Sequence, residues 1–295
     1  MNNVNTETIS ASLSSPAMNE TGWQGRLELD YEYRQNKTIL RQSLVTAPLK
    51  VQRSFYPEGE KLCHTVMLHT AGGIVGGDRL SQSIQLQPKS QVLLTTAAAS
   101  KIYRSDQKFA QQNINIQLAE QSYLEWLPQE TIIFNKAYYV QTLHIELAAQ
   151  AHFCGWEINR LGRTARGETF LAGEWRSRWE IWRGGKPLWI DRQQLVGSET
   201  TVQSPNALGG MPIVATFIWI GQAVNLADLQ AARHLGTTLI EQGKTGLTLT
   251  QGDGLLCRYR GDSTAEVRQW FSQLWDLLRS TYSQRQPIRP RVWSL

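Results

Sequence analysis

The sequence predicts a mainly β protein, a single β-rich domain that carries two α-helices. Three observations lead to this fold class. Apolar and polar residues alternate with a period of two in several separate segments, which is typical of half-buried strands. Glycine-rich turns separate some of these segments at hairpin spacing. Only two segments place apolar residues at helical spacing.

The predicted strands begin at Arg26, where apolar and charged residues alternate through residue 34. The same alternation returns at residues 84–86, 114–118, 139–147 and 175–182. Gly184 and Gly185 interrupt the last segment before apolar residues resume at 188–190, which predicts a hairpin. A second hairpin is predicted where residues 247–249 lead through Gly252 and Asp253 to residues 255–259.

Two segments break the strand pattern and predict helices near residues 225–235 and 263–282. The first begins at Asn225, a favourable N-cap residue, and ends at Gly236. The second opens with Ser263 and Glu266, which form a capping-box pattern. One helical face then collects its apolar residues, at positions 267, 270, 271, 274, 275 and 278. The tail at residues 285–291 contains two prolines and is predicted not to be helical.

Composition excludes several classes of protein. With 41% hydrophobic and 19% charged residues, the chain is globular and not disordered. A formal charge of +5 is too small and too dispersed to require a nucleic-acid partner. The longest apolar stretch, at residues 213–220, is about half the length of a membrane span, so no membrane segment is expected.

The ends of the chain and its cysteines define the predicted organisation. Residues 1–22 are polar and carry no features of a secretory signal, so we expect a disordered polar leader followed by one domain at 23–295. Cys63, Cys154 and Cys257 are odd in number and far apart. This spacing argues against a disulfide framework and favours a reducing compartment, so we expect the protein in the cytoplasm.

Local motifs for catalysis or tight ligand binding are weak. The five histidines show no metal-binding spacing. The glycine-rich stretch at 69–78 lacks the Gly-Lys-Ser/Thr end of a phosphate loop, and no Gly-x-Ser-x-Gly motif is present. Eleven tryptophans and acidic pairs keep one alternative open, a β-rich carbohydrate-active enzyme or carbohydrate-binding module. Strand alternation alone would instead place Trp175, Trp179 and Trp189 in a core.

The C-terminal segment is basic and ends with an aromatic residue. Its arginines could bind phosphates or belong to a solvated tail. A third interpretation is a strand that docks on a protein partner, with Trp293 as its anchor. The sequence leaves these three interpretations open for Arg279, Arg285, Arg289, Arg291 and Trp293.

Five short segments, taken in order, resemble the urease accessory protein UreD family, also called UreH. They are HTAGGIVGGDRL at 69–80, TTAAASKIYRS at 95–105, LEWLPQETIIFNKA at 124–137, RLGRTARGETF at 160–170 and RPRVW at 289–293. The resemblance spans about residues 25–293. It departs from the family pattern at Thr70 or Ala71, where the family often has proline, and near Ala97 and Ala98, where it often has Pro-Gly.

This resemblance implies a non-catalytic maturation factor with a β-helical stack of sheets and two helices. It implies direct binding to UreF, contact with the GTPase UreG through UreF, docking on apo-urease, and an accessory complex that can be dimeric. It also implies no tightly bound cofactor and a transient passage of Ni²⁺ through a water-filled interior. Such a passage needs oxygen ligands and water, whereas a cage of four ligands would trap nickel.

The resemblance and the residue types together select candidate site residues. Asp78 and Glu168 are our first choices for carboxylates along a nickel passage, with Glu125 and Glu130 as second choices. Arginines near them, which are expected to pair with these carboxylates, are Arg104, Arg163 and Arg166. Further motif residues with a structural role are His69, Gly72, Gly73, Gly76, Gly77, Lys101 and Tyr103. For contacts with UreF we expect Arg285, Arg289, Arg291 and Trp293.

Overall fold

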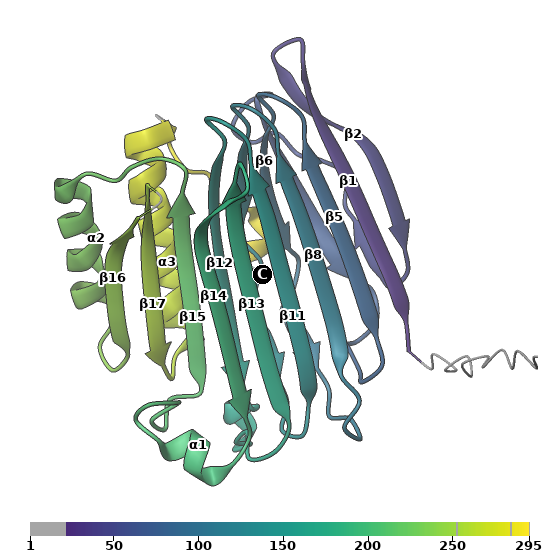
Figure 1. The fold of residues 1–295 in the computed structure, drawn as a ribbon, viewed down its shortest axis with the longest axis vertical. Coiled ribbons are helices and arrows are strands. Elements are labelled where there is room, and N and C mark those ends of the chain that lie inside the picture. The colour runs from purple at the N-terminus through teal and green to yellow at the C-terminus, as the bar shows by residue number, and fades with distance from the viewer. Residues whose placement is uncertain (1–21, 252, 284, 295) are drawn as a thin grey trace, which may run out of the picture.

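Two large β-sheets face one another in the computed structural model, which describes residues 22–251, 253–283 and 285–294 (Figure 1). The first sheet has seven strands in the order β14 (Lys186–Val196), β13 (Glu174–Arg183), β11 (Tyr138–Leu147), β8 (Ala110–Leu118), β5 (Arg79–Leu86), β1 (Gln24–Arg34) and β2 (Lys37–Thr46). The main path of the second runs β16 (Lys244–Thr250), β17 (Gly254–Gly261), β15 (Ile213–Ile220), β12 (His152–Leu161), β9 (Tyr123–Trp126), β6 (Gln91–Thr96), β4 (Leu62–His69) and β3 (Leu49–Val51).

The chain winds between these sheets as a β-helix. Strands β4, β6, β9 and β12 are parallel neighbours in the second sheet, and β5, β8, β11 and β13 are parallel neighbours in the first. Along the sequence these strands alternate between the two sheets, because a parallel neighbour cannot be reached by a tight turn. Both the mainly β class and the β-helical arrangement expected from the family resemblance are confirmed.

Two short strands, β7 (Ser100–Ile102) and β10 (Thr131–Ile133), branch from β12 of the second sheet and form a third, narrow face of the winding. Ile102 pairs in register with Ile133, and Ile133 with Leu161 of β12. Ile74 adds a parallel bridge to Ile102. All four side chains are buried, so each turn of the winding contributes one aliphatic residue to the same stack. Such aligned stacking holds successive turns in register.

Both hairpins predicted from the sequence are present. Strands β13 and β14 pair antiparallel around Gly184 and Gly185, whose φ angles of 55° and 72° are those of a type I′ turn. Strands β16 and β17 pair antiparallel with Thr250 opposite Gly254. Gly252, which the predicted turn includes, lies outside the described residues.

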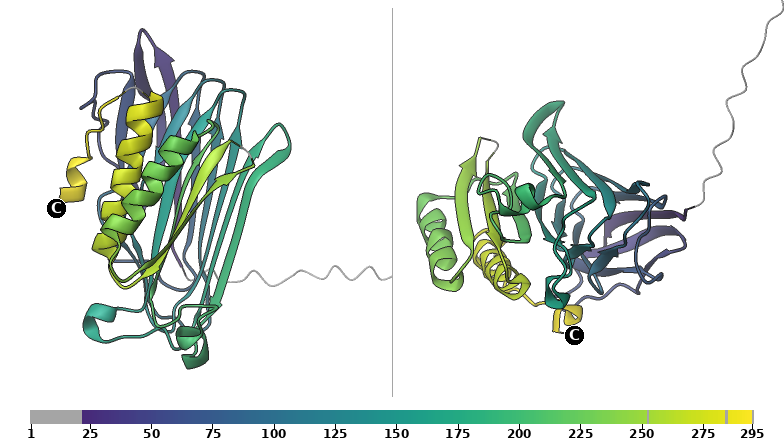
Figure 2. Two further views of the ribbon diagram at one scale, coloured as in Figure 1. Left: turned by 90° about the vertical axis from the view of Figure 1, so that its left-hand side faces the viewer. Right: turned by 90° about the horizontal axis from the view of Figure 1, so that it is seen from below.

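The two predicted helices are also confirmed, as α2 (Leu226–Leu239) and α3 (Thr264–Leu278), with a π-helical turn at Arg279–Ser283. They pack against the second sheet on the side away from the first sheet (Figure 2). Ser263 caps α3 by accepting a hydrogen bond from the Glu266 backbone N–H at 3.2 Å. The apolar face of α3 is buried as its spacing predicts, so the protein has one core between the sheets and another beneath the helices.

The structure adds short helical elements that the sequence analysis did not predict. They are α1 (Glu199–Gln203) and the 3₁₀ turns Thr164–Arg166 and Arg291–Ser294. Residues 285–290 are not helical, as their prolines predict, and a helical turn forms only from Arg291. Residues 1–21 of the predicted polar leader lie outside the described part of the chain. Within that part, no helix is both long and apolar enough to cross a membrane.

Candidate functional site

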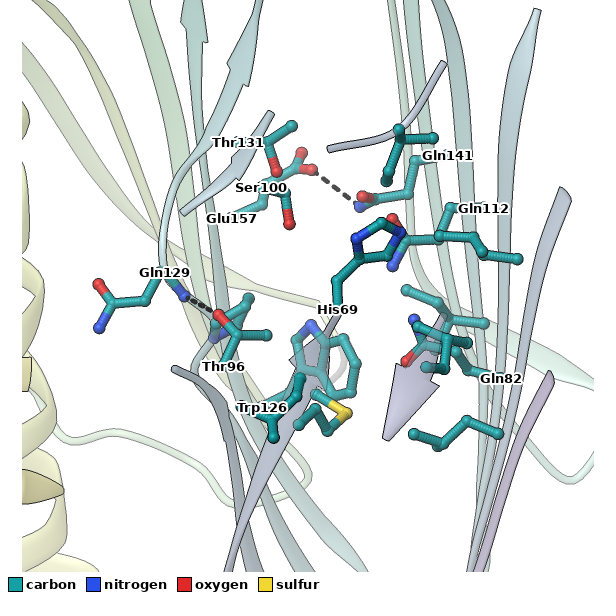
Figure 3. Close-up of a pocket in the computed structure, with 18 of the residues that line it drawn as sticks. His69, Gln82, Thr96, Ser100, Gln112, Trp126, Gln129, Thr131, Gln141 and Glu157 are labelled. Atoms are coloured by element: carbon teal, nitrogen blue, oxygen red, sulfur yellow. Dashed lines mark hydrogen bonds between the residues drawn. The ribbon is translucent and has the colours of Figure 1, made fainter. Parts of the chain in front are cut away.

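A narrow cavity of about 60 Å³ lies between the two sheets (Figure 3). This volume has space for about four water molecules, or for a metal ion that keeps part of its hydration shell. Glutamines from three adjacent strands of the first sheet, Gln82, Gln112 and Gln141, line one side. His69 and Glu157 of the second sheet also line it, together with Ser100 and Thr131 of the third face. A polar lining inside a β-helical core is costly unless its groups bind one another or a polar ligand.

Glu157 is the only carboxylate that lines this cavity among the described residues. It is buried and accepts hydrogen bonds from Ser177 Oγ at 3.0 and 3.2 Å and from Gln141 Nε2 at 3.4 Å. Burial, followed by the nearby charge of Asp191, raises the pKa of Glu157 from 4.5 to about 7. The side chains of Asn159 and Ser177 partly offset this rise, and the charge of Arg258 of β17 offsets it less. Arg258 also binds Asp191 through two contacts of 2.7 and 2.8 Å.

His69 presents an unpaired nitrogen inside the protein. Its Nδ1 lies 3.1 Å from the carbonyl oxygen of Ala71, and a carbonyl can only accept, so Nδ1 carries the proton. In the neutral ring the Nε2 atom then keeps a free lone pair. This Nε2 is buried and has no hydrogen-bond partner among the described residues. Gln82 Oε1 is likewise buried and unpaired within the described chain.

A second cavity of about 100 Å³ adjoins the first and is walled by two predicted motif segments. Its lining includes Gly72 and Gly73 of the glycine-rich loop and Lys101 of β7. Gly73 allows this packing, because a Cβ there would lie 2.3 Å from a Tyr103 ring carbon and 2.7 Å from the Lys101 carbonyl oxygen. Tyr103 also donates a hydrogen bond to the Gly72 carbonyl at 3.1 Å. Both cavities share His69, so this residue lies where they meet.

Asp78, our first choice for a passage carboxylate, binds the backbone of its own loop and of the residue before β1. It is 1% exposed and accepts hydrogen bonds from the backbone N–H groups of Trp23 at 2.8 Å and Val75 at 2.9 Å. Gly77 beside it adopts a φ of 96° and Gly76 packs against Ser105, so this part of the glycine-rich loop is a tight turn. Asp78 does not line the cavities described above, and its part in a nickel passage stays a prediction.

Glu168, the other first choice, forms an ion pair with Arg163, whose Nε lies 3.0 Å away. Hydrogen bonds from Arg163 lower the pKa of Glu168, and the Asn135 backbone N–H adds to this effect. The predicted pairing of Arg163 with this carboxylate is therefore present. No ion pair joins Arg104 or Arg166 to any of the four candidate carboxylates among the described residues. Like Asp78, Glu168 lies away from the two cavities, and its passage role stays a prediction.

Glu125, a second choice, belongs to a buried charged cluster beneath α3 that the sequence analysis missed. It accepts hydrogen bonds from Tyr123 Oη at 2.6 Å and Trp275 Nε1 at 2.9 Å, and Arg279 Nε lies 2.7 Å from its Oε1. Arg279 also pairs with Glu58 at 2.7 Å, and Glu58 contacts His64 Nε2 at 2.8 Å. These contacts connect the C-terminal helix to the β-helix. No local pattern marks Arg279 as buried, because its two carboxylates come from distant segments.

Glu130, Arg268 and Arg289 line a groove of about 380 Å³ beside α3. Glu130 is 3.6 Å from Arg268, and Arg289 pairs with Asp276 at 3.0 Å. Arg285 instead lines a separate hollow of about 280 Å³, near the π-helical turn. Arg291 is exposed at the start of the last helical turn.

Trp293 contacts its own chain. Its ring lies 5.3 Å from the ring of Trp156 and 5.6 Å from that of Trp275, and its Nε1 donates to Thr95 Oγ1 at 3.0 Å. These contacts secure the C-terminal turn against the second sheet. The residue that the sequence proposed as an anchor for a partner therefore serves first as an intramolecular anchor, and its contact with UreF stays a prediction.

The tryptophans do not form a sugar-binding platform in the described structure. Trp175 and Trp179 are almost fully buried, as strand alternation predicts, and Trp189 packs against Trp179. Trp23 is the only tryptophan among the exposed large apolar residues of the described chain. The carbohydrate alternative therefore loses the tryptophan feature that motivated it.

Glu157 is the carboxylate that sequence reasoning missed in the cavity. The available signal was a single acidic residue inside the apolar strand segment FCGWEI at 153–158. Period-two alternation would have placed it on the same face as Phe153, toward the interior. The three glutamines of the cavity gave a weaker signal, because glutamine at an alternating position usually faces solvent.

Comparison with known proteins places this chain in one family. A family model described as UreD urease accessory protein matches residues 24–294. The chain is 57% identical to a protein of Trichormus variabilis over 272 residues, covering 92% of this chain and 96% of the relative. It is 55% identical to one of Nostoc punctiforme over 274 residues (93% and 97%) and 47% identical to one of Synechocystis sp. over 266 residues (90% and 97%). All three relatives are named urease accessory protein UreD. The chain therefore belongs to the UreD family of urease accessory proteins.

Proposed function

We propose that this protein is a non-catalytic maturation factor that assists the insertion of nickel into apo-urease. The observation that carries this proposal is the family match at residues 24–294, which includes both sheets, α2 and α3. The relatives named above are accessory proteins of urease, and urease is the enzyme that this chain would serve. Nickel is the cargo in this proposal and not a resident cofactor.

The cavity between the sheets supports a route for a hydrated cation. Its polar lining supplies amide oxygens, hydroxyls, one imidazole and one carboxylate. No cluster of three or more His, Cys, Asp or Glu side chains in the described residues could hold a metal ion. A conduit benefits from this arrangement, because a complete cage of nitrogen and sulfur ligands would hold nickel too tightly to release it.

The proposed partners are UreF by direct contact, UreG through UreF, and apo-urease, in a cytoplasmic complex that can be dimeric. For UreF we propose the surface formed by α3 and the C-terminal tail. The groove beside α3 contains Arg268 and Arg289, and the hollow near the π-helical turn contains Arg285. Each arginine offers planar hydrogen bonds to carboxylates of a partner.

The test is co-expression of urease structural and accessory genes with and without this chain at ordinary nickel supply. We expect urease without this chain to contain little nickel and to show little activity, and the wild-type gene to restore both. Full nickel loading in its absence would contradict the proposal. A glycan-binding and hydrolysis screen on the purified protein tests the carbohydrate alternative, and substrate turnover there would contradict the non-catalytic role.

A further inference from the structure

We propose that His69 Nε2 is a protein ligand that binds a divalent transition-metal ion inside this chain. The inference rests on the proposed function for the identity of the cargo, nickel. Its basis is the position of the His69 side chain and the proton on its Nδ1 atom, which leaves Nε2 free. The family resemblance identified His69 only as a motif residue. The inference adds to the route a defined binding point where the two cavities meet.

The local contacts of His69 prepare its ring for metal binding. The Nδ1–H group donates to the Ala71 carbonyl at 3.1 Å, which fixes both the ring orientation and the tautomer. Metal-binding histidines commonly donate the second ring N–H to a carbonyl or carboxylate in this way. The Nε2 lone pair is left buried and unpaired among the described residues, a state that costs free energy unless a donor or a cation binds there.

The position of His69 at the end of β4 joins the two cavities. It lines the cavity of about 100 Å³ together with Gly72, Gly73 and Lys101, and it lines the cavity of about 60 Å³ together with Glu157. Figure 3 shows its ring pointing into the space between the sheets, on the side where Gln82 and Gln112 project from the first sheet. An ion that passes from one cavity to the other would therefore pass His69.

The surrounding ligands favour transient binding of a transition metal. Imidazole nitrogen suits Ni²⁺, Co²⁺ and Zn²⁺ better than Mg²⁺, which prefers oxygen. Gln82 Oε1 is a buried, unpaired oxygen in the same cavity, and Glu157 supplies a carboxylate to the same lining. With one nitrogen ligand and no cage, the ion keeps water ligands and can leave. The geometry therefore points to a weak site selective for borderline metals.

The test measures metal binding by the purified full-length chain. Isothermal calorimetry with Ni²⁺ compares the wild type with His69→Ala and with His234→Ala, a matched control at an exposed position of α2. We expect His69→Ala to weaken the tightest Ni²⁺ site at least about tenfold and His234→Ala to change it less than about twofold. Mg²⁺ is expected not to compete. Melting curves check that each variant is folded.

A second measurement uses the unaltered chain and does not depend on a variant that folds. Zn²⁺ replaces Ni²⁺ as a diamagnetic probe, and the histidine ring nitrogens are followed by ¹⁵N magnetic resonance. We expect the His69 Nε2 resonance to shift first. Unchanged Ni²⁺ affinity in folded His69→Ala, or a shift of other histidines while His69 stays constant, would overturn the assignment.

Failure of this assignment is distinguishable from failure of the proposed function. If urease activation requires the chain but His69→Ala binds Ni²⁺ and activates urease like the wild type, His69 is not a metal ligand of this route and the maturation role stands. If urease is fully loaded with nickel without the chain, the maturation role itself fails, whatever the metal titration shows.

Discussion

Arg279 Nε lies 2.7 Å from Glu125 Oε1, and both side chains are fully buried between α3 and the second sheet. Glu58 provides a second carboxylate to the same guanidinium group. Burial raises the pKa of Glu58, but hydrogen bonds from His64 and Arg279 outweigh burial and bring that pKa below its ordinary value. Buried charged groups are destabilising unless they have a partner of opposite charge. The packing of the C-terminal helix against the second sheet therefore depends on Arg279.

Arg279→Ala is therefore expected to destabilise the protein strongly. It leaves the buried carboxylates Glu125 and Glu58 without their cation, which typically costs about 3–5 kcal/mol of unfolding free energy. Denaturant unfolding measures the change. Arg289→Ala, which removes the exposed pair with Asp276, is the matched control and is expected to cost less than about 1 kcal/mol. Equal, small losses for both variants would contradict a structural role for the cluster.

Glu157 is expected to make stability depend on pH. Its pKa is about 7 in the folded protein, against 4.5 for a glutamate that is not buried, so the folded state binds more protons between these values. Its contribution is fully present below about pH 4.5 and is lost as the pH rises through about 7. The loss reaches at most about 3.5 kcal/mol, because the pKa rises by about 2.5 units and each unit corresponds to about 1.4 kcal/mol.

The measurement is the unfolding free energy of wild type and Glu157→Gln between about pH 5 and pH 8. The glutamine cannot ionise, so the variant curve is expected to be flatter than the wild-type curve across this range. Ser83→Ala, on the outer face of the first sheet, serves as a matched control with the wild-type slope. Parallel curves for wild type and Glu157→Gln would show that Glu157 does not titrate in this range.

Gly73→Ala is expected to disturb the cavity of about 100 Å³ that Gly72, Gly73 and Lys101 line. The added Cβ would lie 2.3 Å from the Tyr103 ring and 2.7 Å from the Lys101 carbonyl oxygen, so the backbone must shift. Overpacking of this kind costs about 1–3 kcal/mol. Gly246→Ala is the control, because its Cβ meets no atom within 4 Å, and its melting temperature is expected to stay near that of wild type. Matching melting temperatures for the two variants would contradict the close packing at Gly73.

Asp78→Ala and Glu168→Ala are expected to lower urease activation while the accessory complex still assembles. Asp78 accepts hydrogen bonds from two backbone N–H groups beside the glycine-rich loop. Glu168 forms an ion pair with Arg163 near the third face. Activity and bound nickel of co-expressed urease measure activation, and co-purification with UreF measures assembly. Normal maturation with both variants would remove these residues from any passage role.

Deletion of residues 283–295 is expected to weaken co-purification with UreF. The deletion also removes the packing of Trp293 on Trp156 and Trp275, so stability must be measured in parallel. The double variant Arg285→Ala/Arg291→Ala separates the two effects, because it keeps this packing. We expect the double variant to lose UreF in pull-downs at an unchanged melting temperature, whereas Trp293→Ala lowers the melting temperature. Wild-type recovery of UreF by the double variant would contradict the proposed contact.

Local chemistry in the sequence determined the elements of this protein. Period-two alternation located β1, β8, β11 and β13, paired glycines located the β13–β14 turn, and a serine cap with an apolar stripe located α3. Each of these features depends on residues a few positions apart, which is the range over which turn, cap and strand preferences act. Five short motifs in a fixed order likewise carried the family resemblance.

Only the tertiary structure decided which residues share a site. In the β-helix, lateral neighbours such as Ile102 and Ile133 come from successive turns of the winding, and no local periodicity specifies that register. The cavity that combines His69 with Glu157, and the pairing of Arg279 with Glu125, both depend on this stacking. The physical reason is that burial and charge pairing are properties of the assembled sheets, whereas strand and helix preferences belong to short stretches of chain.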